Sequence, residues 1–164
     1  MRFNHLNDYT HGTPRAITRD SYGFLWIGTY DGLLKYDGYN YTHYTPDTTV
    51  STDRSGRQVR AILADSRSNL WVGTVRGLKK YNYKTNKFRS VRLTANEYIY
   101  DLLESKDGSI WVTTDNGVFR LRGEEVIQHY KTYTGLDGKT HTFGRARTRH
   151  QEMEEIIWVG GSEG

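Results

Sequence analysis

The stretch Phe24-Leu-Trp-Ile-Gly-Thr29 decides the fold, because close copies of it return along the 164-residue chain. The copies are Asn69-Leu-Trp-Val-Gly-Thr74, Ser109-Ile-Trp-Val-Thr-Thr114 and Ile156-Ile-Trp-Val-Gly-Gly161. Their tryptophans are separated by 45, 40 and 47 residues. Internal similarity at a period of about 40 to 50 residues is typical of repeat architectures. The chain is therefore predicted to consist of repeated structural units.

Each unit is predicted to contain four strands. A short apolar stretch opens at Ala16 or Ala61 and ends at an aspartate, Asp20 or Asp65, which begins a tight hairpin turn before the tryptophan strand. Six residues after each tryptophan stands a glycine, which marks a second turn with positive φ. Third strands are expected at 33–36, 78–81 and 118–121, and fourth strands at 41–44, 88–91 and 126–130. Four strands in a unit of this length match the period of a propeller blade.

The predicted fold class is all-β, a partial β-propeller of about 3.5 four-stranded antiparallel blades. The expected units are blade 1 at about 14–45, blade 2 at about 58–93, blade 3 at about 98–133, half of a fourth blade at about 141–164, and an outer strand of a closing blade at 1–6. The segment 145–155 departs from the repeat, since it has almost no apolar residues where a first strand should lie.

Composition supports this assignment and excludes several functions. The chain has 13 Tyr, 4 Trp, 5 Phe, 17 Gly and only 2 Pro, a mixture expected of short strands joined by glycine turns. Its formal charge of +4 comes from 23 basic and 19 acidic residues spread along the whole chain, so no nucleic-acid partner is expected. It has no cysteine, which removes disulfides and thiolate chemistry. No apolar run approaches the roughly 20 residues of a membrane span, so no direct membrane contact is expected.

The repeat resembles that of bacterial two-component regulator propellers, whose pattern runs roughly Val-x-Ala-Ile-x-x-Asp-x-x-Gly-x-Leu-Trp-Ile-Gly-Thr-x-x-Gly-Leu-x-x-Tyr-Asp. The stretch from Arg15 to Asp37 matches it almost position for position, and residues 60–81 and 100–121 match it less fully. The resemblance implies the extracytoplasmic or periplasmic sensor region of a hybrid two-component system, which often responds to carbohydrates. It also implies a histidine kinase elsewhere in the parent chain as a partner.

The function expected from this resemblance is ligand sensing, with detection of carbohydrate or passage of a signal between domains. The alternative is a propeller that serves as a protein-interaction scaffold. A propeller lyase or glycosidase would require a convergent acid and base, and the sequence identifies neither. No enzymatic activity, no cofactor and no metal site are therefore expected, since the six histidines form no i, i+2 or i, i+4 pair.

Residues that recur in every unit are predicted to be structural. The tryptophans are expected to pack between neighbouring sheets, with each ring N–H bonded to a partner. Asp20 and Asp65 are expected to accept backbone N–H bonds in their turns. The hydroxyls of Thr29, Thr74 and Thr114 are expected to bond across strands, because no nucleophile elbow or Ser-His-Asp order surrounds them.

Residues that vary between units are the better candidates for binding, because repeat proteins diversify loops on one face. Two sets of loops qualify: the links after the tryptophan strands, and the links between blades. Together they supply aromatic planes and planar hydrogen-bonding groups suited to a sugar or a short acidic oligosaccharide. The candidate ligand-binding residues are Tyr30, Asp31, Arg57, Arg76, Tyr98, Asp115 and Asn116.

Assembly is the last expectation from the sequence. An incomplete ring of blades leaves strand edges unpaired and blade faces uncovered, and both invite association. The chain is therefore expected to form a homo-oligomer, most simply a two-fold pair, unless its opening strand closes a small four-bladed ring.

Overall fold

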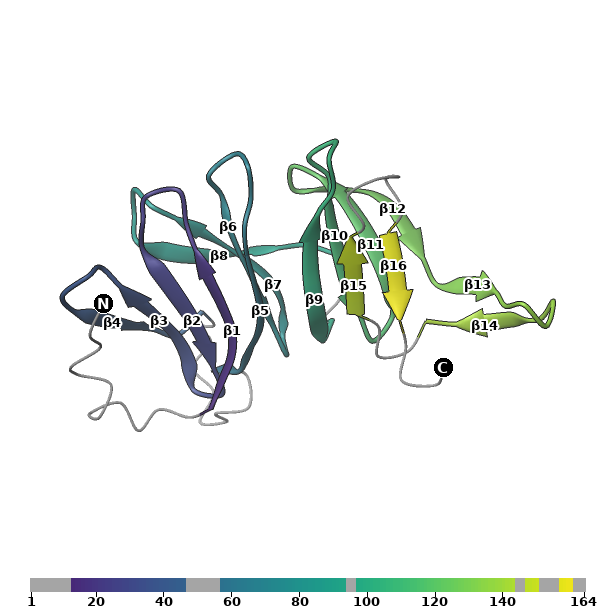
Figure 1. The fold of residues 1–164 in the computed structure, drawn as a ribbon, viewed down its shortest axis with the longest axis horizontal. Helices are drawn as coiled ribbons and strands as arrows, with labels where there is room; N and C mark the ends of the chain where they lie inside the picture. Colours follow the sequence, from purple (N-terminus) through teal and green to yellow (C-terminus); the bar gives the residue numbers. More distant parts are fainter. Residues whose placement is uncertain (1–12, 47–56, 94–96, 144–146, 151–156, 161–164) are drawn as a thin grey trace.

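The computed structural model of the chain describes residues 13–46, 57–93, 97–143, 147–150 and 157–160. These residues form three four-stranded antiparallel sheets in which consecutive strands are hydrogen-bonded neighbours (Figure 1). The all-β class of four-stranded repeats predicted from the sequence is confirmed. The proposed outer strand at residues 1–6 lies outside the described residues.

Each sheet is one blade of the predicted propeller. Blade 1 consists of β1 (Pro14–Arg19), β2 (Leu25–Thr29), β3 (Gly32–Tyr36) and β4 (Tyr41–Tyr44). Blade 2 consists of β5 (Val59–Ala64), β6 (Leu70–Thr74), β7 (Gly77–Asn82) and β8 (Lys87–Val91). Blade 3 consists of β9 (Ile99–Glu104), β10 (Ile110–Thr114), β11 (Gly117–Arg122) and β12 (Glu125–Tyr130).

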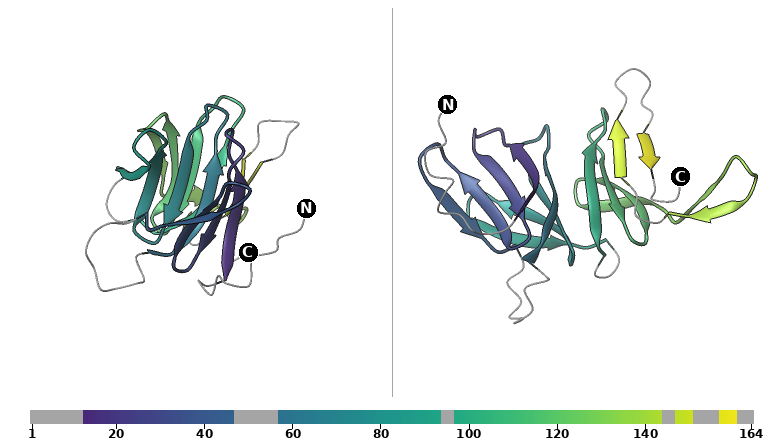
Figure 2. Two further views of the ribbon diagram at one scale, coloured as in Figure 1. Left: turned by 90° about the vertical axis from the view of Figure 1, so that its left-hand side faces the viewer. Right: turned by 60° about the horizontal axis from the view of Figure 1, so that its bottom comes forward.

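The blades pack face to face, with their first strands β1, β5 and β9 adjoining one another (Figure 2). Two apolar clusters fill the spaces between them. The first joins Trp26 and Leu33 of blade 1 to Val59, Leu70 and Val72 of blade 2. The second joins blades 2 and 3; its buried members are Ala61, Trp71, Leu78, Val91, Ile99, Leu102, Ile110, Val112, Phe119 and Leu121. The hydrophobic core is thus divided among the interfaces, as expected when each repeat buries its faces against its neighbours.

In blades 1 and 2 the tryptophan faces the next blade along the chain. Trp26 is 0% exposed and Trp71 is 1% exposed, since each is covered by the following sheet. Trp111 is only half-buried, and its ring stacks on Tyr130 of its own blade at 5.8 Å. The prediction of buried tryptophans is therefore confirmed for two blades and only partly met in the third, where the described residues that follow blade 3 form two short hairpins.

The repeated glycine of the tryptophan strand permits this close packing of sheets. A Cβ placed on Gly28 would lie 2.6 Å from Val59 Cγ1, and one placed on Gly73 would lie 2.5 Å from Ile99 Cγ2. Both distances are shorter than real Cβ contacts, so any side chain at these positions would push the blades apart. The glycine one strand later serves a different purpose, because Gly32 needs its φ of 132° to turn the chain into β3.

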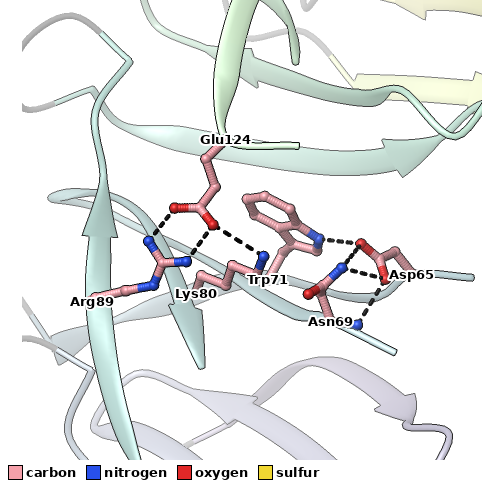
Figure 3. Close-up of polar contacts among 6 residues, drawn as sticks. All are labelled: Asp65, Asn69, Trp71, Lys80, Arg89 and Glu124. Carbon is pink, nitrogen blue, oxygen red and sulfur yellow. Dashed lines mark hydrogen bonds and ion pairs between the residues drawn. The ribbon is translucent and has the colours of Figure 1, made fainter. Parts of the chain in front are cut away.

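Polar contacts also tie the blades together. Tyr83 of blade 2 donates a 2.8 Å hydrogen bond to Asp20 of blade 1. Between blades 2 and 3, Glu124 accepts hydrogen bonds from Lys80 and Arg89, beside the indole of Trp71 (Figure 3). Burial raises the pKa of the Glu124 carboxyl, but the hydrogen bonds from Arg89 and Lys80 outweigh burial and hold it below its usual value.

Two short hairpins follow blade 3. Strands β13 (Thr132–Thr134) and β14 (Thr140–Thr142) form an arm that the sequence did not predict, and this arm projects away from the sheets in Figures 1 and 2. Strands β15 (Arg147–His150) and β16 (Ile157–Gly160) pair antiparallel, and β15 lies beside β9. The segment 145–155, which departs from the repeat, therefore still supplies a strand, β15, where a first strand was expected.

Candidate ligand-binding face

The loops that follow the tryptophan strands lie on the same face as the links between blades, and we call this the loop face. Its central feature is a hollow of about 440 Å³, here termed the loop-face hollow. The lining residues are Tyr30, Gln58, Val75, Arg76 and Tyr98. All three blades and their connections contribute to this lining, so the hollow exists only because the blades are stacked.

The turn that carries Tyr30, Arg76 or Asn116 has the same construction in each blade. The hydroxyl of Thr74 donates to the carbonyl of Gly77 at 2.9 Å and accepts the N–H of Arg76 at 3.0 Å. Thr29 and Thr114 make the same pair of bonds in blades 1 and 3. These hydroxyls are the cross-strand hydrogen bonders predicted from the sequence. They hold the backbone of the variable loops in a fixed shape.

Three of the seven predicted ligand-binding residues, Tyr30, Arg76 and Tyr98, are brought together in the loop-face hollow. Tyr30 is 43% exposed, so part of its ring is open to solvent. Tyr98 is half-buried, and its ring lies 4.9 Å from that of Tyr100. Each blade therefore contributes one aromatic or cationic side chain to a common concave surface.

Asp31 and Arg57 form a different contact. The Arg57 guanidinium lies 3.8 Å from the Asp31 carboxylate, with side chains 37% and 27% exposed respectively. An ion pair this open to water is worth at most about 1 kcal/mol. Both groups lie outside the residues that line the loop-face hollow.

Asp115 and Asn116 are not among the residues that line the hollow, and their side chains bond to neighbouring loop residues instead. The Asp115 carboxylate accepts the backbone N–H of Tyr98 at 3.0 Å, and the backbone N–H of Asp115 donates to the Tyr98 carbonyl at 3.3 Å. The Asn116 amide donates to Glu97 at 3.3 Å. These bonds position Tyr98, so the two residues act on the hollow indirectly.

Sequence reasoning missed several residues of this face. Gln58 and Val75 line the hollow, and the Val75 N–H donates to the Gln58 carbonyl at 3.4 Å across two loops. Arg15 and Arg60 were also missed, although both precede an Ala-Ile pair in the repeat. The Arg15 guanidinium lies over the Tyr30 ring at 4.3 Å, and that of Arg60 lies over Tyr98 at 5.1 Å. The repeated Arg-Ala-Ile was the available signal for them.

The described residues were compared with the requirements of a metal site and of a membrane-spanning helix. No group of three or more His, Asp or Glu side chains there could hold a metal ion. The described residues also contain no helix long and apolar enough to cross a membrane.

The fold and this face define a class of protein: a β-propeller whose four-stranded blades present loops that vary from blade to blade over a repeated scaffold. Three segments of the sequence also match a known family model. Residues 8–31, 53–76 and 93–116 each match the two component regulator propeller model. The resemblance drawn from the tryptophan motif is thereby confirmed. No curated protein matches the chain.

Solved structures share the architecture. One is the extracellular domain of BT4673 from B. thetaiotaomicron, which is assigned to the hybrid two component systems. It is 23% identical in sequence with a TM-score of 0.73, and the match covers 93% of this chain and 21% of the BT4673 chain. The extracellular domain of BT3049, from the same organism and with the same assignment, is 22% identical with a TM-score of 0.67. The match covers 94% of this chain and 28% of the BT3049 chain. Virginiamycin B lyase from Staphylococcus aureus is 17% identical with a TM-score of 0.59, and the match covers 96% of this chain and 58% of the lyase chain. At these identities the likeness shows the fold alone, and the chain spans about a quarter of the sensor domains.

Proposed function

We propose that this chain is part of the sensing propeller of a two-component sensor outside the cytoplasm, and that it binds a carbohydrate at the loop face. The family repeats and the fold shared with extracellular sensor domains support the sensor role. The proposal makes a histidine kinase in the parent chain the downstream partner. It gives the propeller a binding function and no catalytic one.

The observation that carries the proposal is the loop-face hollow. Its volume of about 440 Å³ falls within the usual size of small-ligand sites. Tyr30 and Tyr98 offer flat apolar surfaces against which a sugar ring can pack, and the Arg76 guanidinium and the Gln58 amide offer hydrogen bonds to hydroxyls. An extended chain of sugars could contact more than one blade, because the hollow is built from all three.

Binding of carbohydrate is tested by screening the full chain against an oligosaccharide array and titrating the best ligand by calorimetry. We expect Tyr30→Ala and Arg76→Ala to weaken binding at least tenfold each. Tyr39→Ala and Lys84→Ala serve as matched controls, because both residues are exposed and lie in turns at the opposite ends of the strands. Affinities unchanged in the Tyr30 and Arg76 variants, or an array without any bound oligosaccharide, would overturn the proposal.

The second candidate function is a protein-interaction scaffold, and the β13–β14 arm is the observation that favours it. Leu136 at its tip is fully exposed and Tyr133 is 47% exposed. A two-stranded hairpin alone in water is marginally stable, so a partner covering this arm would stabilise it. Loss of partner binding in Leu136→Asp, with oligosaccharide binding intact, would support the scaffold function.

A further inference from the structure

The first strands of the three blades share one irregularity. In β1, Pro14 pairs with Thr29 and Ala16 pairs with Gly28, so Arg15 is an extra residue without a partner in the ladder. The same break leaves Arg60 extra in β5 and Tyr100 extra in β9. Each is a β-bulge, which bends the strand and redirects the side chain that it carries.

The three redirected side chains meet in one place. Arg15, Arg60 and Tyr100 line a hollow of about 290 Å³ on the wall formed by β1, β5 and β9, here termed the inner-wall hollow. Ile17, 65% exposed, and Asp101 also line it. Because the bulge recurs at one position of every blade, stacking the blades necessarily brings these residues side by side.

Both arginines are held by aromatic rings instead of carboxylates. Arg15 lies over Tyr30 at 4.3 Å, while Arg60 lies over Tyr98 at 5.1 Å and over Tyr100 at 5.9 Å. Among the described residues, neither guanidinium has an ion-pair or hydrogen-bond partner. A guanidinium stacked on a ring keeps the N–H donors at its edge available for a planar anion.

Asp101 is the acidic group on this wall. Its carboxylate accepts the N–H of Leu102 at 3.0 Å. Two guanidinium groups and one carboxylate leave the wall positive. The same tyrosine rings that hold the arginines line the loop-face hollow, so the two hollows adjoin through Tyr30 and Tyr98.

We propose that Arg15 and Arg60 form an anion subsite beside the loop-face hollow, and that the ligand is an oligosaccharide bearing carboxylate or sulfate groups. This inference rests on the proposed function, since it names the chemical class of the ligand. A sugar ring packs in the loop-face hollow, and its neighbour along the chain places an anionic group against the two guanidinium edges. A carboxylate and a sulfate both accept two parallel N–H bonds from one guanidinium.

The test compares matched probes on the full chain by calorimetry. Tetragalacturonate carries carboxylates, and its methyl ester has the same length without charge; a sulfated dextran oligosaccharide and plain dextran of equal length make the second pair. We expect the anionic member of at least one pair to bind about tenfold or more tightly, since charge-assisted hydrogen bonds contribute more than a factor of ten. The pair that shows the difference distinguishes carboxylate from sulfate.

Variants locate the effect. Arg15→Gln together with Arg60→Gln should remove the preference for the anion, and should weaken binding of the anionic probe far more than binding of the neutral probe. Arg15→Lys with Arg60→Lys should keep only part of the preference, because lysine cannot form the paired bonds. Arg19→Gln, on the same strand and exposed, is the control and should change nothing. Far-ultraviolet circular dichroism and thermal unfolding verify that each variant is folded.

Three outcomes separate this inference from the proposed function. Equal affinity for charged and neutral probes would overturn the inference. If that binding were still weakened by Tyr30→Ala, the proposed function would stand. Anion preference that persists in the double glutamine variant would also overturn it. Anion binding that depends on Arg15 and Arg60 but ignores Tyr30 and Arg76 would support the subsite and overturn the proposed sugar site.

Discussion

The indole N–H of Trp26 donates a 2.7 Å hydrogen bond to the carboxylate of Asp20, six residues earlier in the chain. The other oxygen of that carboxylate accepts the backbone N–H groups of Tyr22 and Phe24, so one buried side chain both shapes the turn and satisfies the core tryptophan. Asp65 and Trp71 repeat the bond at 2.8 Å. The aspartates are therefore turn residues, as predicted, with an added role in orienting the interface between blades.

Removing the turn aspartate should destabilise the chain. In Asp65→Ala, the indole N–H of Trp71 and two turn N–H groups lose their acceptor, which should cost about 1–3 kcal/mol of the free energy of unfolding. Urea unfolding followed by circular dichroism measures the loss. Asp37→Ala is the control, because that carboxylate caps an exposed turn and bonds no tryptophan. Equal losses in the two variants would show that the buried indole bond contributes nothing.

The tryptophans should differ in their contribution to stability. Trp71→Ala should cost about 3–5 kcal/mol, the usual range for truncating a large aromatic residue in a core. Trp111→Ala should cost clearly less, because its side chain is only half-buried. Chemical denaturation of both variants under the same conditions provides the comparison. An equal or greater cost for Trp111 would mean that blade 3 is covered more completely than the structure indicates.

The contact around Glu124 should make stability depend on pH. Its pKa is lowered in the folded chain, so its contribution is complete above the usual value of 4.5 and is lost as the pH falls through the lower folded value. Glu124→Gln should therefore be less stable than the wild type at pH 7, by no more than about 1 kcal/mol, and equally stable at strongly acidic pH. Thermal unfolding across this range measures the difference. Glu125→Gln, at the neighbouring exposed position, should show no such trend. A stability difference between wild type and Glu124→Gln that widens toward acidic pH would contradict the stabilising role of the Glu124 carboxylate.

We expect the chain to associate in solution. Trp111 is incompletely covered, and an exposed blade face and open strand edges favour pairing with a second copy. Multi-angle light scattering should give a mass at least twice the 19.0 kDa of one chain. A monomer at high concentration would contradict this expectation and favour a small closed ring.

The repeat made most of the scaffold predictable. Hairpin turns, positive-φ glycines and alternating apolar residues are local signals, and each recurs in register with a tryptophan. The third and fourth strands at residues 78–81 and 88–91, for example, match β7 (Gly77–Asn82) and β8 (Lys87–Val91) within a residue. Local chemistry suffices there because each hairpin closes over a few residues.

The candidate site was only partly predictable. Variable loops pointed to Tyr30, Arg76 and Tyr98, which the fold brings together, but the same argument included Asp115, whose carboxylate is used to hold the loop. Periodicity in sequence cannot distinguish a side chain that lines a hollow from one that bonds the neighbouring backbone. That distinction depends on where the next blade lies.

The sequence by itself determined the blade, its register and its turn residues, because these depend on contacts between strands that follow one another in the chain, and its period marked the tryptophan of each blade. Only the tertiary structure decided that Arg15 and Arg60 leave their strands at a bulge and share one wall, that Glu124 bridges to Lys80 and Arg89, and that Trp111 is less covered than Trp71. The physical reason is the same in each case. These properties belong to surfaces between blades, and they arise only when one sheet packs against another.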